Sequence, residues 1–116
     1  MLFNKWTKLL ARKNNDLIVA HNKELCFIDA NGNTLWKNSL ICPGIPNNAY
    51  VSDDYLLVTT HSEDYHAWGF LGPAILIDLK KGIIIKELKG SHGTVLSEGG
   101  FLLGLEGYDV FDTWAV

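Results

Sequence analysis

The sequence predicts an all-β fold, built mainly as an antiparallel meander that forms an open sheet or a half-barrel. Two observations predict it. After the first dozen residues, short runs of β-branched and aromatic residues alternate with turn signals, which is the pattern of strands and hairpins. Most of these runs are joined by tight polar turns, which connect antiparallel neighbours, whereas parallel strands need long crossovers. We therefore expect about nine or ten short strands.

The N-terminal segment is compatible with two structures. Phe3, Trp6 and Leu10 have helical spacing, so residues 2–12 could form one short amphipathic helix. Alternatively, residues 9–12 pair with residues 17–19 across a turn at 14–15. We favour the strand over the helix.

Turn residues mark the next elements. Residues 17–21 and 24–29 flank a two-residue polar turn and form a hairpin. Asn31-Gly32 then introduces a third strand at residues 34–37, because glycine readily adopts the positive φ of a tight turn. Residues 41–48 contain two prolines and a glycine, so we expect a loop there.

The remaining strands follow the same logic. Strands are expected on both sides of Asp53-Asp54 and of the turn at residues 80–82, with a long polar and aromatic connection between them at residues 61–73. The expected strands of this second part are residues 49–52, 55–60, 74–79, 83–88, 94–96, 101–103 and 108–114. The predicted core consists of large apolar residues within the strands: Leu17, Val19, Phe27, Leu35, Trp36, Leu57, Ile75, Ile77, Ile84, Leu96, Leu102 and Phe111.

Length and charge limit the class of protein. The 116 residues suffice for one domain, residues 1–116. Ten basic and 13 acidic residues give a net charge of −3, which argues against nucleic-acid binding. Lysines interrupt the N-terminal apolar residues, and no apolar run approaches the ~20 residues of a membrane span. We expect a cytoplasmic protein with no membrane association, in which Cys26 and Cys42 stay reduced.

An internal repeat appears in three segments, residues 17–29, 56–78 and 101–112, each of which ends in a hydrophobic residue followed by Asp. Residues 27–36, Phe-Ile-Asp-Ala-Asn-Gly-Asn-Thr-Leu-Trp, resemble the blades of quinoprotein-like β-propellers. The other two copies lack the Trp or the final strand. Because closed propellers need four to eight blades, the resemblance implies either assembly, for example as a homodimer, or blade-like meanders in an open sheet. We favour the open sheet.

Catalytic motifs do not emerge from the pattern. His61 and His66, with carboxylates between them, could hold a metal ion or act as acid and base. Their spacing on a loop fixes no geometry, and neither a metalloprotease motif nor a serine or phosphate-binding motif occurs. We expect no enzyme, no metal and no cofactor. A small hydrolase or metal enzyme built on these histidines is the least favoured alternative.

The charge distribution suggests a binding surface. Residues 41–79 and 90–116 contain acidic residues but no Lys or Arg. Aromatic residues adjoin these acids between residues 63 and 70, and aromatic side chains are common binding hot spots. A surface of this kind fits a basic partner, because complementary charge speeds association. The predicted partner-binding residues are Asp53, Asp54, Glu63, Asp64, Tyr65, His66, Trp68, Phe70, Glu106 and Asp109.

In overall character the chain resembles bacterial immunity proteins, which neutralise the toxins of contact-dependent growth inhibition or type VI secretion. The resemblance implies binding to a cognate toxin, with a basic nuclease domain as the expected partner and its active-site cleft as the surface that is covered. The alternative is a partial β-propeller that self-assembles as a structural or interaction module.

Overall fold

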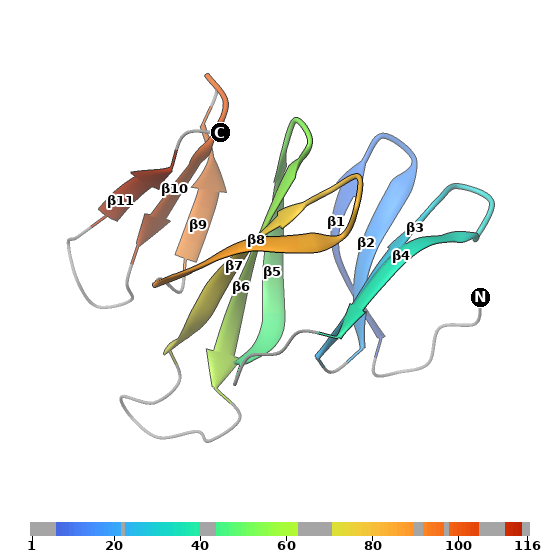
Figure 1. Cartoon of the computed structure of the whole chain (residues 1–116), viewed down its shortest axis with the longest axis horizontal. Helices are drawn as coiled ribbons and strands as arrows, with labels where there is room; N and C mark the ends of the chain where they lie inside the picture. Colours follow the sequence, from blue (N-terminus) through green and yellow to red (C-terminus); the bar gives the residue numbers. More distant parts are fainter. Residues whose placement is uncertain are drawn as a thin grey trace.

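The computed structural model describes residues 7–21, 23–39, 44–62, 71–89, 92–96, 98–104 and 111–114, and all structural statements below concern these residues. They form eleven strands in three antiparallel sheets, with no helix and no sheet closed into a barrel (Figure 1). The predicted all-β, antiparallel fold is therefore confirmed.

The first sheet has the strand order β1-β2-β3-β4. Its strands are β1 (Thr7–Lys13), β2 (Asp16–His21), β3 (Glu24–Ile28) and β4 (Thr34–Ser39). Leu9 lies opposite Val19, as the strand interpretation of the N-terminal segment predicts. A helix is thus wrong for residues 7–12, while residues 2–6 lie outside the described part.

The second sheet has the order β5-β6-β7-β8. Its strands are β5 (Gly44–Ser52), β6 (Tyr55–Ser62), β7 (Leu71–Asp78) and β8 (Ile83–Lys89). The loop predicted at residues 41–48 is wrong from residue 44 onward, because β5 begins there. Pro46 fits because β5 is an edge strand and a β-bulge follows between Pro46 and Asn48. The connection predicted at residues 61–73 is also too long at both ends.

The third sheet is smaller, with the order β11-β10-β9. Its strands are β9 (His92–Val95), β10 (Phe101–Gly104) and β11 (Phe111–Trp114). The three sheets are stacked, and the second sheet lies between the other two (Figure 1). The first strand of each sheet contacts the first strand of the next, so β1, β5 and β9 lie together on one side of the stack.

Two apolar clusters join the sheets. Between the first and second sheets lie Ile18, Ala20, Leu25, Phe27, Trp36, Ala49, Leu56, Val58, Ile75, Ile77 and Leu79. Between the second and third lie Leu57, Ala74, Leu76, Phe101 and Leu103. Successive residues of a strand point to opposite faces, so β6 and β7 bury both faces. This explains why residues 56–60 and 74–77 are continuously buried instead of alternating between buried and exposed.

Half of the predicted core is confirmed as buried: Val19, Phe27, Trp36, Leu57, Ile75 and Ile77. Leu17, Leu96 and Leu102 are partly buried, and the side chain of Phe111 lies outside the described part. Leu35 and Ile84 are wrong, with 50% and 37% of their surfaces exposed. Both belong to the outer edge strands, β4 and β8. Leu35 also lies in a bulge, between the paired residues Thr34 and Trp36.

Candidate functional site

Of the predicted partner-binding residues, the structure describes Asp53 and Asp54, in the turn between β5 and β6. The others lie outside the described residues: Glu63, Asp64, Tyr65, His66, Trp68, Phe70, Glu106 and Asp109. The turn precedes Tyr55 at the beginning of β6, whereas residues 63–70 follow Ser62 at its other end. That these residues form one surface with the turn stays a prediction.

The β5–β6 turn is tied to the sheets on both sides. Asp53 has a positive φ of 51°, a conformation that Asp and Asn adopt more readily than most residues. Its backbone carbonyl accepts a hydrogen bond from Lys13 Nζ, at the end of β1. On the other side, Ser52 Oγ accepts a 3.0 Å hydrogen bond from the backbone N–H of Gly100, next to β10. The turn therefore has a defined position relative to all three sheets.

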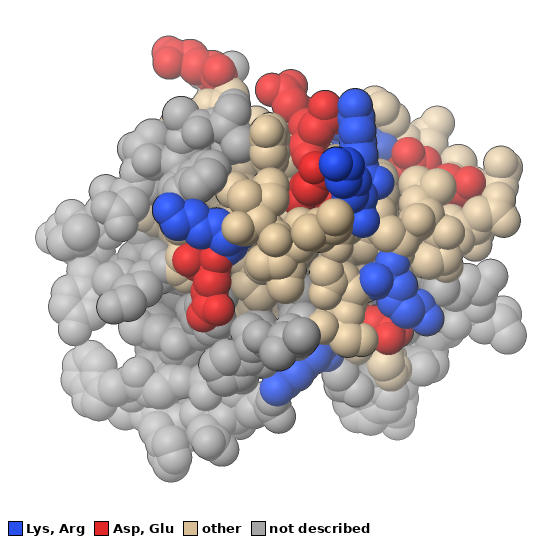
Figure 2. All heavy atoms as spheres, viewed as in Figure 1, with Lys and Arg blue, Asp and Glu red and all other residues tan. Residues whose placement is uncertain are grey.

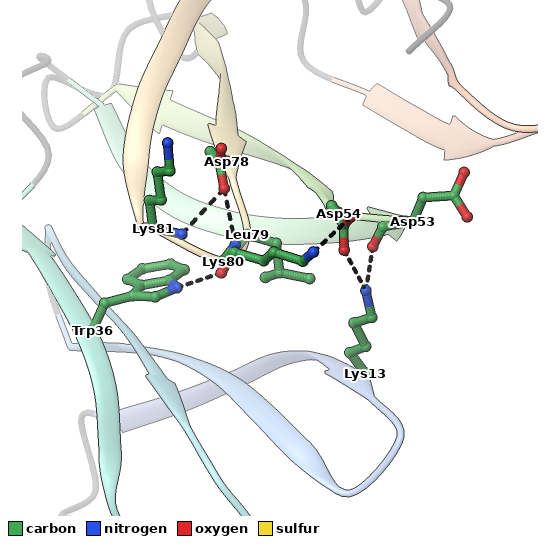
Figure 3. A network of polar contacts seen from close by, with 8 residues as sticks. All are labelled: Lys13, Trp36, Asp53, Asp54, Asp78, Leu79, Lys80 and Lys81. Carbon is green, nitrogen blue, oxygen red and sulfur yellow. Dashed lines mark hydrogen bonds and ion pairs between the residues drawn. The ribbon is translucent and has the colours of Figure 1, made fainter.

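Asp54 connects the first sheet to the β7–β8 turn (Figure 3). Its carboxylate lies 3.4 Å from Lys13 Nζ and 3.4 Å from Lys80 Nζ, and its backbone carbonyl accepts a 2.8 Å hydrogen bond from the Leu79 N–H. Partial desolvation raises the pKa of Asp54, but the hydrogen bonds and charges of Lys80 and Lys13 outweigh this, so the pKa lies below its ordinary value. The negative charge of Asp54 is thus balanced by two lysines.

Trp36 forms a second contact between the same two sheets. Its indole N–H donates a 2.6 Å hydrogen bond to the backbone carbonyl of Leu79, and its ring lies against Gly82 in the β7–β8 turn. The ring also packs on Phe27, with 5.7 Å between the ring centroids. Asn38 adds a 2.7 Å hydrogen bond to the carbonyl of Gly82. The Trp of the repeat pattern therefore joins one sheet to the next.

The Asp of the repeat pattern organises a turn. Asp29 Oδ1 accepts hydrogen bonds from the N–H groups of Asn31 and Asn33, at 3.0 and 2.9 Å, and the backbone hydrogen bond from Asn33 is the main reason for its lowered pKa. Asp78 Oδ1 accepts in the same way from the N–H groups of Lys80 and Lys81. Asp112 differs, because it lies within β11, opposite Leu103.

The turns that follow Asp29 and Asp78 differ in length by one residue. The N–H of Gly32 bonds the carbonyl of Asp29, three residues earlier, whereas the N–H of Gly82 bonds the carbonyl of Asp78, four residues earlier. Four residues after its glycine, β4 has Trp36, while β8 has Lys86. The second sheet therefore lacks the Trp contact that the first sheet makes.

The described residues contain no cluster of metal-binding side chains. Nowhere in this part of the chain do three or more His, Cys, Asp or Glu side chains gather where they could hold a metal ion. Burial raises the pKa of the Cys26 thiol, and the neighbouring Glu24 adds to the effect, so this cysteine stays protonated. Cys42 lies outside the described residues.

No helix among the described residues could cross a membrane. No protein-family model, curated protein or solved structure matches the chain. The fold and the turn contacts define an all-β protein of three stacked antiparallel meanders.

Sequence reasoning missed two features of this region. It assigned Asp54 to a partner-facing surface without its two lysines, because Lys13 and Lys80 lie 41 and 26 positions from Asp54 in the chain. It also assigned Ile84 of β8 to the core, although Ile84 is 37% exposed. A signal for the second was present: every Lys of residues 41–116 lies between positions 80 and 89.

Proposed function

We propose that this chain is a protein-binding module and not an enzyme. The observation that carries the proposal is the exposed β5–β6 turn, which contacts with both neighbouring sheets hold in place. Binding residues are often found on turns that a rigid scaffold positions. A turn that is already ordered also loses little conformational entropy when it binds, which favours affinity.

The partner we propose is a basic toxin domain, in the first place a nuclease whose cleft holds phosphates. The acidic stretches without Lys or Arg support a basic partner. Asp53 also supports it, because its side chain is exposed, whereas the neighbouring Asp54 is already ion-paired with Lys13 and Lys80. On this proposal Asp53 and the predicted residues from 63 to 70 contact the toxin. Asp54 positions the turn.

The experiment that tests this is capture of a basic partner from the source organism, followed by binding kinetics. Asp53→Lys should slow association several-fold and weaken its salt dependence, because rim charges act mainly on the encounter. Trp68→Ala should instead speed dissociation, at a cost of ~2 kcal/mol or more. Glu87→Lys is the control, since it makes the same change in net charge on β8.

Two outcomes would contradict the proposal. One is that the tightly captured partner is not basic. The other is that Asp53→Lys and Glu87→Lys change association equally, because net charge alone would then explain the effect.

A second candidate function, self-assembly as a partial propeller, is favoured by the arrangement of the sheets. The first two sheets are four-stranded meanders, the first strands β1, β5 and β9 lie together, and Trp36 joins consecutive sheets. Blades around a propeller axis are arranged similarly, and a ring needs at least four. Light scattering over a wide concentration range separates the candidates. A defined multiple of the chain mass supports self-assembly, and a constant monomer mass contradicts it.

A further inference from the structure

The turn between β3 and β4 contains Asn31-Gly32, the one place in the chain where glycine follows asparagine. An asparagine in this position can react with the next residue. The backbone nitrogen of that residue gives up its proton to water and attacks the side-chain Cγ. A carbon–nitrogen bond closes a succinimide ring, while the side-chain amide takes up a proton and leaves as ammonia. Water then opens the ring to aspartate or isoaspartate. Glycine favours the attack, because it has no Cβ to obstruct it.

The structure exposes this pair and requires its glycine. The turn lies at the outer edge of the molecule, in the upper right of Figure 1 and Figure 2. Asn31 and Gly32 are both exposed. Gly32 has a φ of 86°, which residues with a Cβ rarely adopt, so the residue that the turn needs is also the one that makes Asn31 reactive. Asn38 and Asn47 differ, because hydrogen bonds hold their side chains and the residue after each has a Cβ.

Hydrogen bonds to Asp29 keep the turn closed. The N–H of Gly32 donates a 3.0 Å hydrogen bond to the carbonyl of Asp29, and the N–H of Asp29 donates one of 2.9 Å to the carbonyl of Asn33. The Asp29 carboxylate accepts the backbone N–H groups on both sides of Gly32, those of Asn31 and Asn33. Attack on Asn31 Cγ requires the Gly32 nitrogen to lose its proton and turn towards that side chain. The closed turn opposes both, so it protects Asn31.

We propose that Asn31 is a site of spontaneous deamidation, and that Asp29 sets its rate by keeping the turn closed around the Gly32 nitrogen. The reaction then proceeds when the turn opens, and a surface turn opens locally at a much lower free energy than the whole fold. The site is separate from the β5–β6 turn and does not depend on the proposed toxin.

The two products have different consequences. Aspartate at position 31 adds a negative charge close to the carboxylate of Asp29. Isoaspartate lengthens the backbone between the N–H groups of residues 31 and 33, both of which Asp29 accepts. This product therefore loosens the turn immediately before β4, the strand that carries Trp36.

The experiment incubates the whole chain in mildly alkaline buffer and maps its peptides by mass spectrometry, with a fragmentation method that separates aspartate from isoaspartate. In the folded chain we expect Asn31 to convert before Asn38 and Asn47. Conversion of Asn31 should be about tenfold or more slower in the folded chain than in the chain unfolded in urea, because the closed turn protects it. Gly32→Ala should slow conversion strongly in urea, since a Cβ then obstructs the attacking nitrogen.

Variants of Asp29 test the protection. Asp29→Ala should speed conversion of Asn31 several-fold in the folded chain, and Asp29→Ser, which keeps one acceptor oxygen, should have a smaller effect. Circular dichroism verifies that each variant is folded. Asp78→Ala is the matched control, because it removes the corresponding carboxylate from the β7–β8 turn and leaves the turn at Asn31 intact.

Three results would overturn the proposal. The first is equal conversion of Asn31 in the folded and the unfolded chain. The second is an equal effect of Asp29→Ala and Asp78→Ala, because a general loss of stability would then explain the faster reaction. The third is no conversion of Asn31 in either the folded wild type or folded Asp29→Ala. None of these results depends on whether a toxin partner is captured.

Discussion

At the scale of single residues, Trp36 and Gly82 form the most specific contact between the sheets. A Cβ atom added to Gly82 would lie 2.4 Å from Trp36 Cδ2, closer than any two such atoms can approach. Gly82 also has a positive φ of 71°, which residues with a Cβ rarely adopt. Two independent reasons therefore require glycine at this position.

We expect Gly82→Ala to lower the free energy of unfolding by about 2 kcal/mol or more, through backbone strain and collision with the indole. Urea unfolding followed by circular dichroism measures this. Gly32→Ala is the matched control, because Gly32 has a φ of 86° in the corresponding turn and is exposed. Gly32→Ala should lower the free energy of unfolding only through backbone strain, because Gly32 is open to water. Equal losses for the two variants would therefore contradict the role of the Trp36 contact.

Trp36→Ala should lower the free energy of unfolding by about 3–5 kcal/mol, because it removes a large buried side chain. It also leaves the carbonyl of Leu79 without its indole donor. In a double-mutant cycle, Gly82→Ala should cost less in the Trp36→Ala background than in the wild type. A loss below about 1 kcal/mol for Trp36→Ala would show that the ring stabilises the sheet contact much less than its burial indicates.

Residue patterns correctly placed Trp36 in the core, although its partners Leu79 and Gly82 belong to the next sheet. They predicted Leu35 and Ile84 wrongly for a physical reason. An apolar residue in a strand is buried only if another layer covers it, and coverage depends on strand order, which local patterns do not encode.

At the scale of elements, the turns hold the sheets together. Asp54 belongs to the β5–β6 turn, and its two ion pairs reach the end of β1 and the β7–β8 turn. Because its pKa in the folded state lies below the ordinary value of 3.8, the ionised carboxylate stabilises the fold above that pH. This contribution is lost as the pH falls below 3.8 and through the folded-state pKa.

We therefore expect Asp54→Asn to reduce the acid sensitivity of the protein. The free energy of unfolding should fall less between about pH 5 and about pH 3 than in the wild type, and the variant should be less stable at the higher pH. Denaturant titrations at the two pH values measure this. Asp53→Asn is the control, because it leaves the ion pairs of Asp54 in place. An acid response unchanged from that of the wild type would contradict the role of the ion pairs.

The elements themselves were largely predictable. Hairpins follow from tight polar turns, so β2–β3, β5–β6 and β7–β8 were expected. The beginning of β5 was not, because Pro46 normally argues against a strand. What allows it is an edge position and a bulge, at which Thr59 Oγ1 donates a 2.8 Å hydrogen bond to Asn47 Oδ1. The turn at Asp53-Asp54 could be predicted from the sequence. The two lysines that pair with Asp54 could not, because they approach it only in the tertiary structure.

At the scale of the whole molecule, the second sheet connects the other two through opposite faces. Leu56 belongs to the cluster shared with the first sheet, and Leu57 to the cluster shared with the third. Both are fully buried. The second sheet cannot lose its packing on one side without exposing a face, so we infer that the described sheets unfold together.

Leu56→Ala and Leu57→Ala should each lower the free energy of unfolding by about 2–5 kcal/mol within a single transition. Tryptophan fluorescence and circular dichroism should give the same midpoint for each variant. Ile85→Ala is the control and should cost much less, because Ile85 is nearly half exposed. Separate transitions for the two probes would show that the third sheet unfolds independently of the first.

Burial on both faces has a consequence for how the second sheet finds its strand alignment. A slip of one residue in β6 would exchange Leu56 and Val58 with Leu57 and Thr59, and each face would remain largely apolar. Hydrophobic collapse alone therefore discriminates weakly between the correct pairing and its neighbour. The turns at Asp53-Asp54 and Asp78 must select the alignment early in folding. Weakening one of them, as in Asp78→Ala, should trap part of the refolding population in shifted hairpins, visible as an added slow phase in stopped-flow fluorescence.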